Sequence, residues 1–294
     1  MSSGTLRFDE KEFRANFGKE PFLVKHSLVG HPLFELPKLI ELAQSLPESS
    51  VEYNAGNVPV SIDPSQTPRT GLSIEETIRR IEECKSWMVL KNVERNPAYR
   101  ELLDLCLNDV AELSEKMYPG MYMREAFIFV SSPGSITPFH LDPEYNFLLQ
   151  IRGEKEMHVF DGSDRTIMPE DELERFYTGG FRNLVFKDDF EKKAKVFTLQ
   201  PGDALHVPVA YPHWVKNGNA VSISFSITFL AGESYRRAAL YRINHKLRKM
   251  GLRPSGVGNS SFSDGLKFTA FKTLRTIKSL VRRTPSEMSR KYGA

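Results

Sequence analysis

The stretch "TPFHLDPEYNFLLQIRGEKEMHVF", residues 137–160, places an imidazole and a carboxylate two residues apart, just ahead of an apolar run. Residues i and i+2 of an extended chain point to the same face of a sheet, so His140 and Asp142 point together. Pro138 and Pro143 bracket the pair, which is typical of the end of a strand. Such a pair supplies two of the three ligands of a two-histidine-one-carboxylate Fe(II) site.

The third ligand of such a site has to be a histidine from another strand, and the sequence offers three. His158 lies in "KEMHVF", where Met157 and Val159 take the opposite face, so it is expected to point outward. His206 lies within the apolar strand "DALHVPV" and is also compatible with a buried core histidine. His213 follows an apolar strand and the kinked "PVAYP" segment. This pattern favours His213 over His206.

Polar residues near the pair suit a second, anionic ligand. Lys155 begins the strand after the hairpin and can offer a cation to a carboxylate. Thr137 offers a hydroxyl on the side of the pair, while Asn146 and Gln150 share a parity that directs both toward the interior. Taken singly, Lys155 is typical of a solvated hairpin and Asn146 of a turn. A ligand site is favoured because Lys155 and Asn146 occur close to His140 and Asp142 in the sequence.

The order of predicted elements indicates a β protein with flanking helices. Residues 121–232 contain short β-type segments separated by turn signals such as Pro-Gly-Asp and Asn-Gly-Asn, which predicts a sandwich or jelly-roll core. Residues 1–120 are predicted to form an N-terminal mixed α/β region that packs on this core. Residues 233–294 are predicted to form a basic C-terminal helical region.

The charge is distributed unevenly along the chain. From Tyr235 to the C-terminus there are 15 Lys and Arg against 2 Asp and Glu, a net charge of +13, while the preceding residues carry 25 basic and 35 acidic side chains. This asymmetry predicts contact with an acidic partner, either nucleic acid, an anionic membrane or an acidic protein. The alternative is that the basic tail folds back on the acidic body of its own chain or of a second copy.

Other classes are disfavoured by composition. The sequence has no run of about 18 apolar residues, so no transmembrane helix is expected. The first residues lack the basic and apolar regions of a secretory signal. The two cysteines, Cys84 and Cys106, have no spacing typical of a disulfide framework or a metal site. These features predict a cytoplasmic protein.

Residues 137–160, together with "LQPGDALHVPVAYPHWV" at 199–215, resemble the core motif of JmjC-type, cupin-like Fe(II)/2-oxoglutarate oxygenases. The similarity is greatest to the asparaginyl hydroxylase that inhibits hypoxia-inducible factor and to its bacterial cupin-like relatives. The resemblance implies a double-stranded β-helix, or jelly-roll, core. It also implies that His140, Asp142 and His213 match the residues that bind iron.

The resemblance implies a cosubstrate site as well. Thr137 and Lys155 match residues that bind the distal carboxylate of 2-oxoglutarate, and Asn146 matches one beside its iron-chelating end. The family has a further Asn on the last core strand, where this sequence reads "VSISFSITF". Thr228 falls at that position, so either Thr228 or Ser226 of this hydroxyl-bearing face is expected to contact the cosubstrate.

The expected activity is hydroxylation of a C–H bond in a protein or peptide side chain, or in a natural product, with formation of succinate and CO₂. Demethylation is expected instead where the attacked carbon is bonded to nitrogen. The loop at 53–71 is expected to wall the substrate cleft, and the C-terminal helices of the relatives imply a homodimer contact. The alternative is a cupin-like metal-binding module or regulator without oxygenase activity, which contacts nucleic acid or membrane through its basic tail.

Overall fold

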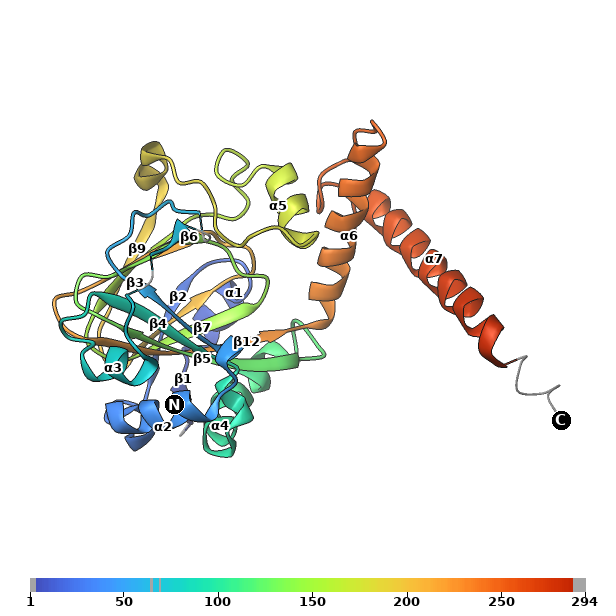
Figure 1. The fold of residues 1–294 in the computed structure, drawn as a ribbon. Helices are drawn as coiled ribbons and strands as arrows, with labels where there is room; N and C mark the ends of the chain where they lie inside the picture. Colours follow the sequence, from blue (N-terminus) through green and yellow to red (C-terminus); the bar gives the residue numbers. More distant parts are fainter. Residues whose placement is uncertain (1–3, 64–65, 69, 288–294) are drawn as a thin grey trace. The chain divides into compact units, whose positions relative to one another are not determined.

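The computed structural model describes residues 4–63, 66–68 and 70–287, and within them the strands form two antiparallel sheets (Figure 1). The larger sheet has the order β1 (Leu6–Arg7), β2 (Phe22–His26), β10 (Asp203–Val207), β7 (Tyr145–Arg152), β12 (Ser222–Leu230), β5 (Tyr122–Ser131), β4 (Ser86–Lys91) and β3 (Val51–Ala55). The smaller sheet has the order β6 (Ile136–His140), β11 (His213–Asn217), β8 (Lys155–Val159) and β9 (Lys195–Leu199). The predicted jelly-roll core is confirmed.

Helices flank these sheets, as the sequence predicted. They are α1 (Glu10–Asn16), α2 (Leu36–Ser45), α3 (Ile74–Arg79), α4 (Pro97–Ser114), α5 (Glu170–Tyr177), α6 (Gly232–Lys249) and α7 (Ser261–Glu287). Asn96 caps α4 by accepting a hydrogen bond from the backbone N–H of Ala98. Ser73 and Glu76 form the capping box that starts α3.

Strand β12 alternates hydroxyl-bearing and apolar side chains, and both of its faces are buried. This strand pairs with β7 so that Thr228 lies opposite Asn146 and Ile227 opposite Phe147. The apolar face of β12 packs against the residue that ends α1, where the Phe17 ring stacks on that of Phe229 with centroids 6.3 Å apart. The other face, which carries the hydroxyl groups, is left to line the interior of the jelly roll.

An apolar cluster fills part of the space between the two sheets. It contains Leu148, Met157, Val159, Leu199, Leu205, Val207 and Val215, which come from both sheets. Three of these residues, Leu148, Met157 and Val215, also line a cavity of about 360 Å³. The hydrophobic core therefore forms the floor of that cavity.

Contacts divide the chain into two compact units: residues 1–168 with 181–232, and residues 169–180 with 233–294. The N-terminal strands β1 to β4 belong to the same large sheet as the core strands. In the second unit, Arg248 of α6 pairs with Glu174 of α5 at 2.8 Å, and the Tyr177 and Tyr241 rings stack at 5.0 Å.

The predicted basic helical region corresponds to α6 and α7. Gly251, with a φ of +79°, follows the end of α6, where a glycine readily adopts the left-handed conformation that ends a helix. Residues 288–294 of the predicted region lie outside the described residues. Within the part of the chain that the structure describes, no helix is both long enough and apolar enough to cross a membrane.

Candidate metal and cosubstrate site

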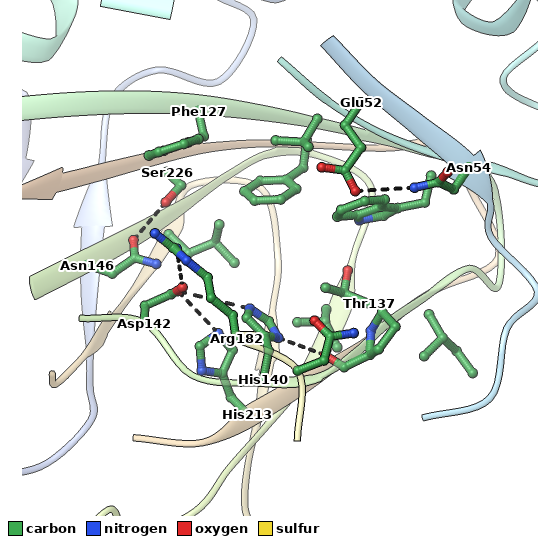
Figure 2. A pocket seen from close by; sticks show the side chains of 18 of the residues that line it. Glu52, Asn54, Phe127, Thr137, His140, Asp142, Asn146, Arg182, His213 and Ser226 are labelled. Carbon is green, nitrogen blue, oxygen red and sulfur yellow. Dashed lines mark hydrogen bonds and ion pairs between the residues drawn. The ribbon is translucent and has the colours of Figure 1, made fainter. Parts of the chain in front are cut away.

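The structure brings together three side chains that the sequence singled out as metal ligands. His140 ends β6 and His213 begins β11, and the two lie directly opposite each other in the antiparallel pairing. Asp142 follows β6, and its Oδ2 lies 4.0 Å from Nε2 of His140 and 3.9 Å from Nε2 of His213. One ligand atom of each residue lies within 4.8 Å of those of the other two. Figure 2 shows the carboxylate of Asp142 facing both imidazoles.

Backbone carbonyl groups fix the orientation of both imidazoles. Nδ1 of His140 lies 2.7 Å from the carbonyl oxygen of Pro138, and Nδ1 of His213 lies 2.9 Å from that of Tyr211. A ring that donates its Nδ1–H in this way presents a free lone pair on Nε2, which is how metal-binding histidines are oriented in proteins. Burial lowers the pKa of His213 to about 4, so this imidazole is neutral at physiological pH.

The carboxylate of Asp142 is held from the other side by an arginine. Nη1 of Arg182 donates to Oδ1 of Asp142 at 2.7 Å, while Nη2 donates to Oε1 of Glu144 at 3.1 Å (Figure 2). Burial alone would raise the pKa of Asp142, but the positive charges of His140 and Arg182 outweigh it and lower that pKa. Two imidazoles and one carboxylate are the donor set of a non-haem Fe(II) site, so the residues fit such a metal.

The residues that the sequence proposed for cosubstrate binding line the same cavity. They are Thr137, Asn146, Lys155, Ser226 and Thr228. Lys155 is 4% exposed, and within the described residues no hydrogen bond or ion pair reaches its ammonium group. Burial lowers its pKa to about 7. A buried cation that lacks a carboxylate partner suits the binding of an anionic ligand.

The hydroxyl-bearing face of β12 contributes two neighbouring groups. Ser226 Oγ donates to Oδ1 of Asn146 at 2.8 Å, and Thr228 Oγ1 lies 3.4 Å from the backbone oxygen of Glu125. The first contact fixes the Asn146 amide against the large sheet. Because both hydroxyl groups line the cavity, which of them contacts the cosubstrate stays a prediction.

Three other candidates have contacts away from the metal ligands. His206 is fully buried, and burial lowers its pKa to about 3. Its Nε2 accepts a hydrogen bond from the N–H of Gly18, and its Nδ1 lies 3.1 Å from the backbone oxygen of Asn146. His158 stacks on Trp214, with ring centroids 3.8 Å apart. The amide of Gln150 bonds to Ser222 and Ser224 of β12 instead of lining the cavity.

Sequence reasoning missed several residues that line the cavity. Arg182 and Glu144 lie beside the proposed metal ligands, and the outer wall contains Glu52, Trp87, Lys91, Phe127 and Phe129. Glu52 accepts hydrogen bonds from both Asn54 and Lys91. The polar stretch at 53–71 does reach the cavity, through Asn54, Ala55, Val58 and Thr67. The wall residues of β4 and β5 follow the ordinary alternation of a strand, so the sequence carried no further signal that marked them as part of a site.

Comparison with known proteins agrees with this arrangement. A family model described as the cupin-like domain matches residues 65–230, which is more than half of the chain. The chain belongs to this cupin-like family. JmjC-containing proteins are among its relatives, and the predicted nearness to the asparaginyl hydroxylase stays a prediction.

The curated relatives are longer than this cupin-like chain. HSPB1-associated protein 1 of Rattus norvegicus is 30% identical over 118 residues, which cover 37% of this chain and 25% of that protein. Jumonji C domain-containing protein 5 of Drosophila melanogaster is 29% identical over 141 residues, which cover 45% of this chain and 33% of that protein. The chain therefore spans about a quarter to a third of the length of these relatives.

Solved structures extend the likeness across almost the whole chain. The structure of Escherichia coli ycfD has a TM-score of 0.54 and 17% sequence identity, covering 96% of this chain and 69% of that one. A structure of the same protein in complex with cobalt and 2-oxoglutarate has a TM-score of 0.50 and 15% identity, with 97% and 69% covered. At these identities the likeness establishes the fold of the cupin-like chain.

Proposed function

We propose that this cupin-like protein is an Fe(II)- and 2-oxoglutarate-dependent oxygenase. The observation that carries the proposal is the convergence of His140, Asp142 and His213 in one cavity with Lys155, which has no ion-pair partner among the described residues. The relatives support it, because Escherichia coli YcfD is described as a ribosomal oxygenase and was solved with cobalt and 2-oxoglutarate. A relative from Xenopus tropicalis is named lysine-specific demethylase 8.

In the proposed reaction, one oxygen atom of O₂ enters succinate as 2-oxoglutarate loses CO₂, and the other enters the substrate C–H bond. Bound iron supplies the redox chemistry that couples these two events. His140, Asp142 and His213 would hold the metal and leave its remaining coordination positions to ligands. The carbonyl contacts orient the rings of both histidines, and Met157 and Val215 add apolar surface to the floor of the cavity.

The cosubstrate is proposed to lie between the metal ligands and Lys155. The ammonium group of Lys155 and the hydroxyl of Thr137 would bind the distal carboxylate. Asn146, held by Ser226, would lie near the keto-acid end. Thr228 is placed on the same face and would contribute a hydroxyl group where relatives carry an amide.

We also propose that the substrate is a side chain of a protein or peptide. Names of relatives support this, since they include HSPB1-associated protein 1 and a ribosomal oxygenase. The outer wall offers aromatic surface from Trp87 and Phe127 and paired charges from Glu52 and Lys91. Such a mixture can hold the apolar stem and polar tip of a side chain.

We expect purified protein to bind Fe(II) and 2-oxoglutarate together, because the triad supplies the metal site and Lys155 the anion site. The result would be a weak visible charge-transfer band under anaerobic conditions that requires both components, and slow succinate formation once air is admitted. Absorption spectroscopy and a coupled succinate assay measure these outcomes, with protein reconstituted with Zn(II) as the redox-inactive control. A protein that shows neither the band nor succinate would refute the oxygenase proposal.

A second proposal concerns the basic C-terminal helices, which would contact an anionic partner. An aromatic cluster of Tyr235, Phe268 and Phe271 joins α6 to α7, and cations surround it. Lys272 lies 4.8 Å from the ring centroid of Phe268, and Arg275 lies 5.6 Å from that of Tyr235. Partly exposed rings beside cations on one helix pair suit an anionic membrane surface or nucleic acid.

Replacing both Lys272 and Arg275 with Glu is expected to weaken retention on anionic vesicles roughly tenfold or more at low salt, since each cation near such a surface contributes about 1 kcal/mol. Co-sedimentation with vesicles containing phosphatidylglycerol, and a parallel gel-shift with DNA, measure the effect. The matched control replaces Lys38 and Arg79 of the first unit. Equal retention of both variants and the unaltered protein would argue against a role for these helices.

A further inference from the structure

Arg182 contacts two carboxylates at once, and only one of them belongs to the metal triad. Its Nη1 binds Oδ1 of Asp142 at 2.7 Å, which leaves Oδ2 as the oxygen that faces both histidines. Its Nη2 binds Oε1 of Glu144 at 3.1 Å. The planar fork of a guanidinium can bind two acceptors in fixed directions, whereas a lysine acts as a single point charge.

The backbone of Arg182 is fixed to the strand end that carries the ligands. The N–H of Leu141 donates to the carbonyl of Arg182 at 3.2 Å, and the N–H of Leu184 donates to that of Phe139 at 2.9 Å. His140 and Asn183 form a bridge between these two hydrogen bonds. The segment at 182–184 thus runs along β6 in register with the metal ligands. These backbone contacts therefore hold the Cα of Arg182 at a fixed place beside Asp142.

Glu144 is a second carboxylate in the cavity that holds the proposed metal ligands. It follows Asp142 by two residues, its side chain is 13% exposed, and it lines the cavity. Its oxygens nevertheless lie outside the group of ligand atoms formed by the triad. The proposed chemistry requires about three open coordination positions for the cosubstrate and O₂. A second carboxylate on the metal would fill one of them.

We propose that Arg182 is a positioning residue that restricts Asp142 to one metal-facing oxygen and holds Glu144 away from the metal. This inference rests on the proposed metal site and deepens the proposed function. Without the guanidinium, Asp142 is free to bind through both oxygens, and Glu144 loses its only described cationic partner. Either change closes a position that 2-oxoglutarate needs, while the metal itself stays bound.

The test uses the full chain loaded with Mn(II), whose exchangeable bound water molecules are counted by water-proton relaxivity. Unaltered protein is expected to show about three such waters. Arg182→Gln is expected to retain Mn(II) within about threefold in affinity, to lose about one water, and to weaken 2-oxoglutarate binding at least tenfold. Arg182→Gln with Glu144→Gln is expected to regain the lost water. Arg182→Lys is expected to give an intermediate loss.

The control is Arg124→Gln, because Arg124 also bridges two side chains, Asp104 and Asn108, but does not line the cavity. It is expected to match the unaltered protein in every Mn(II) measurement. Thermal melting of all variants separates a change at the metal from a loss of fold. An Arg182→Gln protein with unchanged water count and 2-oxoglutarate affinity would overturn the inference. A double variant that does not recover would overturn the part that assigns the lost water to Glu144.

The same measurements separate this inference from the oxygenase proposal. Protein that binds Mn(II) and shows the water changes, yet forms no succinate with iron, supports the role of Arg182 and contradicts the proposed activity. Protein that binds no Mn(II) overturns the metal site and the role of Arg182 together.

Discussion

Replacing His213 with alanine is expected to abolish tight Fe(II) binding and to lower 2-oxoglutarate turnover by about a thousandfold or more. The side chain is the proposed ligand from β11, the strand that pairs with β6, and its Nε2 lies 3.9 Å from Oδ2 of Asp142. A thousandfold change corresponds to about 4 kcal/mol of lost transition-state stabilisation, which is reasonable for a reaction that depends on a metal. Isothermal titration with Mn(II) and a succinate assay measure both effects.

His158→Ala is the matched control. His158 of β8 lies opposite Trp214, the residue that follows His213 on β11, and stacks on the Trp214 ring outside the cavity. It is expected to bind the metal normally. His206→Ala is expected to cost roughly 2–4 kcal/mol of folding stability, since it empties a buried site and leaves the N–H of Gly18 without its acceptor. Metal binding that survives in His213→Ala but is lost in folded His206→Ala would reverse the assignment.

Lys155→Met is expected to raise the KM for 2-oxoglutarate by about a hundredfold while leaving metal affinity nearly unchanged. The ammonium group is the buried cation proposed for the distal carboxylate, and breaking a buried charge pair costs roughly 3 kcal/mol or more. The affinity of the unaltered protein should fall as the pH rises above about 7, because burial lowers the pKa of Lys155 to about 7 and the ligand requires the charged form.

The same side chain sets an expected pH dependence of stability in the absence of ligand. Its pKa is lowered from 10.5 to about 7 on folding, so between those values the unfolded chain binds more protons than the folded chain. Stability should therefore rise with pH through this window, by at most on the order of 5 kcal/mol, and Lys155→Met should lack that rise. Urea unfolding at pH 7 and pH 9 measures it.

The control for both Lys155 experiments is Lys216→Met, since Lys216 lies on the neighbouring strand β11 but is exposed. It should alter neither the KM nor the pH slope. If Lys155→Met left the KM within a few-fold of that of the unaltered protein, the proposed cosubstrate orientation would be wrong.

The triad could be predicted from the sequence because its members follow local rules. His140 and Asp142 share one face through strand parity, and the proline-bearing kink before His213 indicated a return of the chain to the interior. The hydroxyl face of β12 was predictable for the same reason, since alternation along a strand survives folding. The capping signals at Ser73 and Asn96 likewise depend on neighbours within three residues.

Arg182 and Gln150 show where such rules end. Arg182 lies on the irregular segment "TGGFRNL", and its contact with Asp142 spans 40 residues, so no periodicity predicts it. Gln150 has the parity of Asn146, yet its amide bonds to the backbone of Arg152 and Gly153 and to the hydroxyl of Ser222. The alternation of side chains along β7 predicted which face of the sheet Gln150 is on. It did not predict that the cavity ends before Gln150.

The pairing of His140 with His213 also has a consequence for the order of events as the chain folds. His140 and Asp142 lie two residues apart, whereas His213 follows His140 by 73 residues. His213 approaches the other two only when β6 and β11 pair. A nascent chain can offer at most a local, weak two-ligand site before that alignment. Tight metal capture would therefore be a late event, and its binding energy would stabilise the completed jelly roll as a whole.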